Sequence, residues 1–284
     1  MTSARQNTLH QRVDGLARIR FKKAADGRTT LGELYQRAPC RLLFPNTEPG
    51  EPLQAVLLTT SGGLTGGDRT RVEIEMDAQT SATVTTQAAE KLYRALPDSD
   101  DTRIEVAVRV GEGAWAEWLA QETIFFEAAR LRRSLVADVA PQGRLLAVES
   151  LVFGRAAMGE RVCNGRLHDA WRLSRNSRLI WADALHLDGD IRELLHAPFG
   201  FGTAVACSTV VYVAPDANTL LGDLRQLIAQ YELPASATAL DGFLVIRMLA
   251  ENAARLREAV MRVSAAIRSR AGKLPAHMPR VWYC

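Results

Sequence analysis

The chain has 284 residues, of which 47% are hydrophobic and 24% are charged, and its formal net charge at neutral pH is +3. This length and apolar content are sufficient for a substantial core in one large domain or two small ones. The charges are interspersed, without a basic stripe, a signal peptide or a membrane-spanning run, which argues against a nucleic-acid-binding or membrane protein and predicts a cytoplasmic one.

From about residue 13 to residue 214, short runs of alternating polar and apolar residues are separated by Gly, Pro, Asn and Asp. Arg103–Val110 is typical of these runs. Turn residues recur about every eight to twelve positions, which predicts an all-β sandwich, barrel or solenoid without deciding among them. Within this region, Gln87–Arg94 is expected to form a short helix or turn.

The pattern changes after Pro215. Asn218–Ile228 carries apolar residues at helical spacing and follows Asp216, a residue typical of helix caps. A strand is predicted over Gly242–Arg247. A long helix is predicted over Ala250–Arg270, with Leu256, Val260, Val263 and Ile267 forming one apolar stripe.

No Gly/Ser-rich linker marks the change near Ala214. We therefore predict a single domain over residues 1–284, with a β body at 13–214 and an α/β C-terminal subregion at 215–284. Four cysteines are scattered without a C-x-x-C pair or metal-finger spacing, which favours reduced thiols over a disulfide framework.

A glycine-rich segment, Gly62-Gly63-Leu64-Thr65-Gly66-Gly67-Asp68, follows the apolar run Ala55–Leu58. It lacks the Lys-Ser/Thr of a phosphate-binding loop, and the following Arg71–Met76 alternates like a strand, so a nucleotide site is not indicated. The segment is instead expected to form a tight turn between strands, with at least one glycine at positive φ.

Five further segments follow the glycine turn in the order Thr86–Arg94, Trp118–Phe126, Gly154–Glu160, Leu185–Leu187 and Met278–Trp282. In order and spacing the set resembles the urease accessory protein D family, called UreD or UreH, over almost the whole chain. One departure is Thr60-Ser61, which stands where the family usually has an Asn/Pro-rich pair.

The resemblance implies a mainly β fold, in the form of a β-solenoid-like stack of short strands with a C-terminal α-helical subregion. It also implies a non-catalytic maturation factor, a scaffold or conduit in the delivery of nickel to apo-urease. The implied partners are the accessory protein F, the GTP-hydrolysing accessory protein G that F bridges to, and apo-urease itself.

Three carboxylates are predicted on apolar faces of strands. Period two places Glu122 with Trp118, Glu149 with Leu145, and Asp183 with Trp181. A buried carboxylate must be paired, hydrogen-bonded, neutralised or hydrated. Two interpretations remain open: ion pairs with Lys91, Arg94 or Arg155, or an internal polar path for a divalent cation.

Carboxylates alone bind nickel weakly, which suits a passing ion better than a resident cofactor. The family resemblance favours such a path. The candidate residues are Asp68, Glu122, Glu149, Glu160 and Asp183, with nickel as a transient passenger and no tightly bound cofactor.

His186 is a weaker candidate, because on a strand it points away from Asp183 although Asp188 and Asp190 follow it. The other histidines are isolated in sequence and are expected to be surface or core residues.

No catalytic residue is proposed, because the chain lacks G-x-S-x-G and H-E-x-x-H motifs. Two alternatives remain: a pure protein-binding scaffold with no direct metal contact, and an uncharacterised hydrolase.

Overall fold

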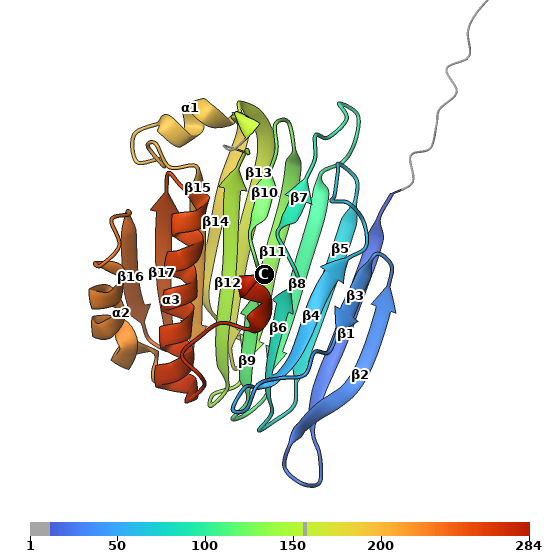
Figure 1. The fold of residues 1–284 in the computed structure, drawn as a ribbon, viewed down its shortest axis with the longest axis vertical. Coiled ribbons are helices and arrows are strands. Elements are labelled where there is room, and N and C mark those ends of the chain that lie inside the picture. Colours follow the sequence, from blue (N-terminus) through green and yellow to red (C-terminus); the bar gives the residue numbers. More distant parts are fainter. Residues whose placement is uncertain (1–11, 156–157) are drawn as a thin grey trace, which may run out of the picture.

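The computed structural model describes residues 12–155 and 158–284. In this part of the chain the strands form two sheets that pack face to face, and helices cover the outer side of one of them (Figure 1). The mainly β prediction and the C-terminal helical region are confirmed, whereas the solenoid form stays a prediction.

The seven-stranded sheet has one face toward the core and one toward the outside, so successive residues of its strands point alternately inward and outward. Its strands, in spatial order, are β14 (Arg178–Asp190), β13 (Asn164–Arg175), β11 (Arg130–Val139), β8 (Thr102–Val110), β5 (Arg69–Met76), β1 (Asp14–Lys23) and β2 (Thr29–Arg37). In β5 every second residue is buried, which matches the alternation in its sequence.

The ten-stranded sheet is covered on both faces over its central strands. Its main path runs β16 (Ala235–Leu240), β17 (Phe243–Ala250), β15 (Ala206–Val213), β12 (Arg144–Phe153), β9 (Trp115–Leu119), β6 (Ser81–Thr86), β4 (Leu53–Thr59) and β3 (Cys40–Leu43). Strand β10 (Thr123–Phe125) also pairs with β12, and β7 (Glu90–Leu92) pairs with β10. Strand β12 is buried along almost its whole length, as expected for a strand with apolar layers on both sides.

Between β4 and β13 the chain passes back and forth from one sheet to the other. Strands β4, β6, β9 and β12 are parallel neighbours in the ten-stranded sheet. Strands β5, β8, β11 and β13 are parallel neighbours in the seven-stranded sheet. Residues far apart in sequence therefore meet at equal heights between the sheets.

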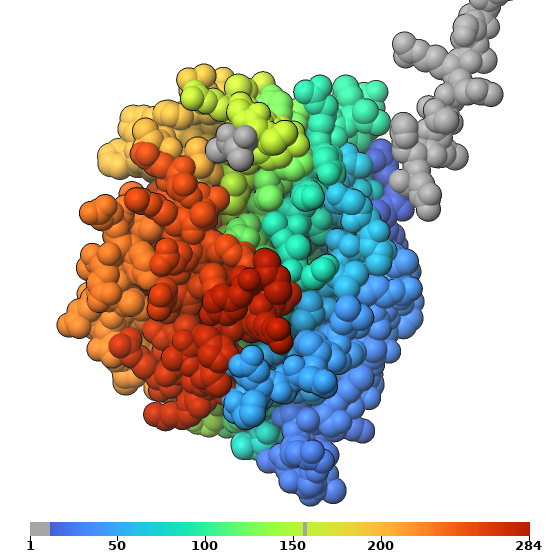
Figure 2. Space-filling model, in the orientation of Figure 1, coloured from blue at the N-terminus to red at the C-terminus, as the bar shows by residue number. Residues whose placement is uncertain are grey.

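The helices of the described residues are α1 (Ile191–His196), α2 (Leu221–Ile228) and α3 (Ala253–Gly272), with the short 3₁₀ helices η2 (Ala217–Leu220) and η3 (Arg280–Tyr283). The C-terminal residues cover the ten-stranded sheet in the view of Figure 2. None of these helices has both the length and the apolar character needed to cross a membrane.

Helix α3 confirms the predicted long helix, and Leu256, Val260, Val263 and Ile267 are all buried against the sheet. A fully buried Arg268 adds a polar tie. Its Nε lies 2.9 Å from Glu117 Oε1 on β9, and its Nη2 lies 2.5 Å from Glu51 Oε2. The helix is thus fixed to the sheet by charge as well as by apolar contact.

Two local predictions are wrong. Gln87–Arg94 contains strand β7 rather than a helix or turn, because the N–H of Glu90 donates to the carbonyl of Glu122 and the carbonyl of Lys91 accepts from Leu64. Asp216 makes no cap for the helix after it. Its carboxylate accepts instead from Tyr212 and pairs with Arg144.

The glycine turn packs directly on β7, through a parallel bridge between Leu64 and Leu92. Gly63 has a φ of +135° and Gly67 a φ of +86°, as the sequence predicts. A Cβ on Gly63 would lie 2.5 Å from a ring carbon of Tyr93, whereas a Cβ on Gly62 would have nothing within 4 Å. A side chain can therefore be accommodated at Gly62 but not at Gly63.

We predict that Gly63→Ala destabilises the protein by about 2 kcal/mol or more, because the left-handed backbone and the Tyr93 contact both oppose a Cβ. Gly62→Ala is the matched control and should leave the melting temperature close to that of the wild type. Thermal unfolding followed by circular dichroism measures both. Equal melting temperatures for the two variants would contradict this account of the turn.

Candidate functional site

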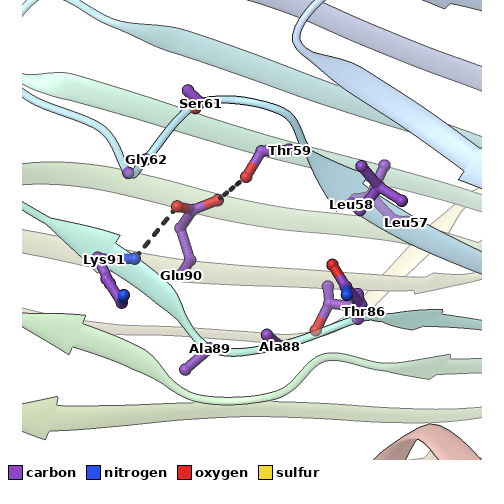
Figure 3. A pocket seen from close by; sticks show the side chains of 12 residues that line it. Leu57, Leu58, Thr59, Ser61, Gly62, Thr86, Ala88, Ala89, Glu90 and Lys91 are labelled. Carbon is purple, nitrogen blue, oxygen red and sulfur yellow. Dashed lines mark hydrogen bonds between the residues drawn. The ribbon is translucent and has the colours of Figure 1, made fainter.

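A cavity of about 230 Å³ opens beside the glycine turn and is lined by a half-buried carboxylate, that of Glu90 (Figure 3). Thr59, Ser61, Thr86 and Glu90 line it, and the Oγ1 of Thr59 donates to Glu90 Oε2 at 3.3 Å. The N–H of Lys91 donates to the other oxygen at 3.1 Å. Burial raises the pKa of Glu90 above its ordinary value. Among the described residues, Ser61 Oγ is buried without a hydrogen-bond partner.

A second, inner cavity of about 50 Å³ adjoins the first, and Glu90, Thr59 and Thr86 line both. Its far wall is formed by Arg133 and Glu149, which lie between the two sheets. The polar lining interrupts a core that is otherwise made of residues such as Val106. Glu90 near the mouth thus borders the same inner cavity as Arg133 and Glu149.

Arg133 is the centre of a buried ion cluster that joins the sheets. From β11, its Nη1 lies 2.5 Å from Glu149 Oε2 on β12. Its Nε and Nη2 donate to the two oxygens of Asp169 on β13, at 2.8 and 2.6 Å. Thr123 Oγ1 accepts from Nη1 at 3.1 Å, and Trp118 Nε1 donates to Glu149 Oε1 at 2.8 Å. The side chain of Arg133 is only 3% exposed.

The cluster has one guanidinium for two carboxylates. With both carboxylates ionised it carries one excess negative charge at a buried position. Burial raises the pKa of Glu149, the nearby charge of Asp169 acts in the same direction, and Arg133 opposes both. Burial alone would lower the pKa of Arg133, but Asp169 and Glu149 raise it above its ordinary value. The site therefore favours binding of a proton or of another cation.

A third cavity of about 40 Å³ lies on the other side of the cluster and is lined by Arg133, Glu149, Asp169, Asp183 and Cys207. Asp183 forms an ion pair with Arg247, and both side chains are partly exposed, so this cavity lies near the surface. Burial raises the pKa of Cys207 to about 12. The thiol therefore stays protonated at neutral pH and is a poor metal ligand.

The three cavities thus form a polar series that runs from the glycine turn, past Glu90 and the Arg133 cluster, to Asp183. Two predicted path residues, Glu149 and Asp183, line this series. Both lie on the inner strand faces, as predicted. Their ion-pair partners, however, are Arg133 and Arg247 rather than Lys91, Arg94 or Arg155, because the two sheets bring together strands that are distant in sequence.

Asp68 and Glu160 lie elsewhere. The carboxylate of Asp68 accepts from the N–H groups of Val13 and Thr65, at 2.9 and 2.8 Å, and so closes the glycine turn onto the start of β1. Glu160 lies 2.6 Å from Arg155, and that hydrogen bond holds the pKa of Glu160 below its ordinary value.

The face predicted for Glu122 is wrong. Residues 120–122 interrupt the strand between β9 and β10, so period two does not continue from Trp118. Glu122 instead lies 2.8 Å from Arg257 on α3, on the other side of the sheet, and that guanidinium also donates to the carbonyl of Trp282. Arg257 thus ties α3 both to the segment between β9 and β10 and to the C-terminal residues.

His186 and Asp183 point to opposite faces of β14, as predicted, because Asp183 lines the third cavity while His186 is exposed. His168, which is isolated in sequence, has a histidine neighbour in the fold. It lies directly opposite His186 on the antiparallel β13–β14 pair, and their ring centroids are 5.7 Å apart. Asp188 faces Arg166, and Asp190 caps α1. Within residues 12–155 and 158–284, no group of three or more His, Cys, Asp or Glu residues could hold a metal ion.

Three residues of the series are absent from the sequence-based set: Glu90, Arg133 and Asp169. Arg133 and Asp169 each occupy an apolar strand face, beside Leu131 and Leu167, so the criterion that selects Glu149 would also select them. Glu90 lies in a short strand without such a face, and its sequence carries no comparable signal.

We predict that Arg133→Met destabilises the protein by about 3–5 kcal/mol, because it leaves two buried carboxylates without a cation. Glu149→Gln should cost only about 1–2 kcal/mol, since Asp169 still neutralises Arg133 and one hydrogen bond is lost. Urea unfolding followed by circular dichroism measures both. Equal losses in the two variants would show that the excess carboxylate is not a feature of the folded protein.

Comparison with known proteins assigns the family. A family model described as UreD urease accessory protein matches residues 13–283. The chain is 43% identical to a urease accessory protein UreD of Methylobacterium sp. (strain 4-46), over 96% of this chain and 95% of the relative. It is 39% identical to the UreD of Magnetococcus marinus, over 96% and 94% of the two chains. For the UreD of Rhizobium leguminosarum bv. trifolii the identity is 38% over 99% of both. The chain therefore belongs to the family of UreD urease accessory proteins.

Proposed function

We propose that this protein acts in the maturation of urease, as a non-catalytic scaffold through which nickel passes on its way to the apo-enzyme. Membership of a urease accessory family supports the maturation role, because that family is named for an accessory factor rather than for urease itself. The polar series from Glu90 to Asp183 supports the passage of a cation.

The observation that carries the passage is the excess carboxylate at the Arg133 cluster. Glu149 and Asp169 together exceed the charge of Arg133, and Glu90 adds a half-buried carboxylate without an ion-pair partner among the described residues. Carboxylate and hydroxyl oxygens attract a divalent cation but hold nickel weakly. Arg133 lowers that affinity further, because a cation must compete with it for the same oxygens.

The size of the cavities suits a partly hydrated ion. The two inner cavities, at about 50 and 40 Å³, each exceed the roughly 10–15 Å³ that one water molecule requires. The mouth supplies Ser61 Oγ, a buried oxygen without a partner among the described residues, within the wall that also contains Glu90. An ion could thus exchange water for protein oxygens in steps.

The partners we propose are apo-urease and the accessory proteins F and G, with F in direct contact. Exposed apolar side chains support the presence of a protein-binding surface. Phe199 is fully exposed and Met158 is 75% exposed. Both are close in sequence to residues that line a groove of about 510 Å³, among them His196 and Gly159. Exposed apolar residues around a groove are typical of protein-interaction sites.

A pure scaffold that never contacts metal is the second candidate. It is favoured by one observation, namely that Glu122, Glu149 and Asp183 each have an arginine partner. On this alternative the interior charges serve folding alone. A hydrolase is less well supported, because burial raises the pKa of Cys40 to about 11 and of Cys207 to about 12, the reverse of an activated thiol.

Glu90→Gln separates the two candidates, because Glu90 lines the passage but holds no arginine. In cells that produce urease and its accessory proteins, the variant replaces the wild-type chain at limiting nickel. If the variant raises the free-energy barrier to the passage of the ion by about 1.4 kcal/mol, the rate of nickel transfer falls about tenfold. Nickel per urease, measured by mass spectrometry, should fall accordingly and recover in part with excess nickel.

The matched control is Glu258→Gln, which removes an exposed carboxylate from α3. It should leave the nickel content of urease unchanged, and immunoblotting should show equal amounts of both variants. If Glu90→Gln supports full nickel loading at limiting nickel, the passage is refuted and the pure scaffold is retained.

A further inference from the structure

Three arginines stand side by side on the outer face of the seven-stranded sheet. Arg69 on β5, Arg103 on β8 and Arg132 on β11 occupy matching register positions on neighbouring parallel strands. The residue after Arg69 and the residues before Arg103 and Arg132 are buried in the core, so the three guanidinium side chains point outward. We call these three residues the arginine row.

The row continues at one end into His168 on β13 and His186 on β14, which occupy the next two register positions. Five consecutive strands therefore present Arg, Arg, Arg, His and His in one line across the sheet. About 4.8 Å separates neighbouring strands, so the row is a linear array of hydrogen-bond donors with a regular spacing.

Folding does not account for the row. No carboxylate of the described residues forms an ion pair with an arginine of the row, and the undescribed positions contain no Asp or Glu. Asp14 on β1 is the register neighbour of Arg69, but its carboxylate pairs with Arg37. The next line of the same face is different, because Arg71 lies 3.0 Å from Glu105. Like charges directly opposite one another on adjacent strands destabilise a sheet. The three arginines of the row therefore form no ion pairs among the described residues, although the neighbouring register position of the same face has one.

We propose that the arginine row binds an acidic segment of a partner protein, presented as one face of a helix. Carboxylates three or four residues apart on a helix lie about 5–6 Å from one another, close to the distance between strands. A helix laid across the strands would thus place successive carboxylates opposite successive arginines. This surface lies outside the cavities, and the proposal does not depend on the passage of nickel.

The surroundings favour a protein carboxylate over the other ligands that a basic row could bind. Beyond the row the charges of the outer face are compensated, because Glu73 pairs with Arg18 and Glu105 pairs with Arg71, so an extended nucleic-acid backbone would gain little from that part of the face. A metal ion at the His168–His186 pair would be repelled by Arg132, which is the register neighbour of His168. The row therefore favours a short anionic ligand, such as the carboxylates of a protein.

The test uses the full-length protein and a fluorescein-labelled helical peptide that has glutamates every three or four residues along one face. Fluorescence anisotropy should show binding at low salt that disappears at high salt. Arg103→Glu reverses the central charge and should weaken binding about tenfold. Arg178→Glu makes the same charge change at an exposed position outside the row and should change the affinity less than about twofold.

A second measurement separates binding from folding. Arg103→Gln should melt at or above the temperature of the wild type, because it removes repulsion without breaking an ion pair. A lower melting temperature would overturn the proposal by making the row structural. Equal affinities for Arg103→Glu and Arg178→Glu, or tighter binding of a single-stranded RNA of equal charge, would also overturn it.

Discussion

The buried guanidinium of Arg133 imposes the constraint on which the interior of this protein depends. It lies between the two sheets and contacts carboxylates from β12 and β13 at 2.5 and 2.6 Å. Removing such a group from water is unfavourable unless its partners are close and well oriented. The parallel strand order satisfies this requirement, because β11 and β13 are neighbours and β12 faces them from the other sheet.

The same cluster creates the polar series. Apolar side chains fill the space between the sheets on one side of it, whereas charged and hydroxyl groups leave small cavities around Arg133 and Glu90. Helix α3 closes the outer face of the ten-stranded sheet and carries its own buried ion pairs, from Arg268 to Glu51 and Glu117. Each of the two clusters has one guanidinium for two carboxylates. The Arg268 cluster holds the helix, whereas the Arg133 cluster lies between the sheets and lines the two inner cavities.

Patterns along single elements could be predicted from the sequence, and contacts between distant elements could not. The stripe of α3, the alternation of β5 and the inward faces of Glu149 and Asp183 follow from periodicity. Periodicity fails where a strand is interrupted, as before Glu122, and where pairing with distant segments forms β7. The partner of Glu149 and the arginine row depend on strand register across the fold, which a single sequence does not reveal.

The central claim is that the interior carboxylates attract a divalent cation. Anomalous X-ray diffraction at the nickel absorption edge, on crystals soaked in nickel at several concentrations, tests it most directly. The account predicts anomalous density between the sheets, beside Glu90 or between Glu149 and Asp169, and its loss in Glu149→Gln crystals. Density confined to the outer surface at every concentration, with none between the sheets, would contradict the account.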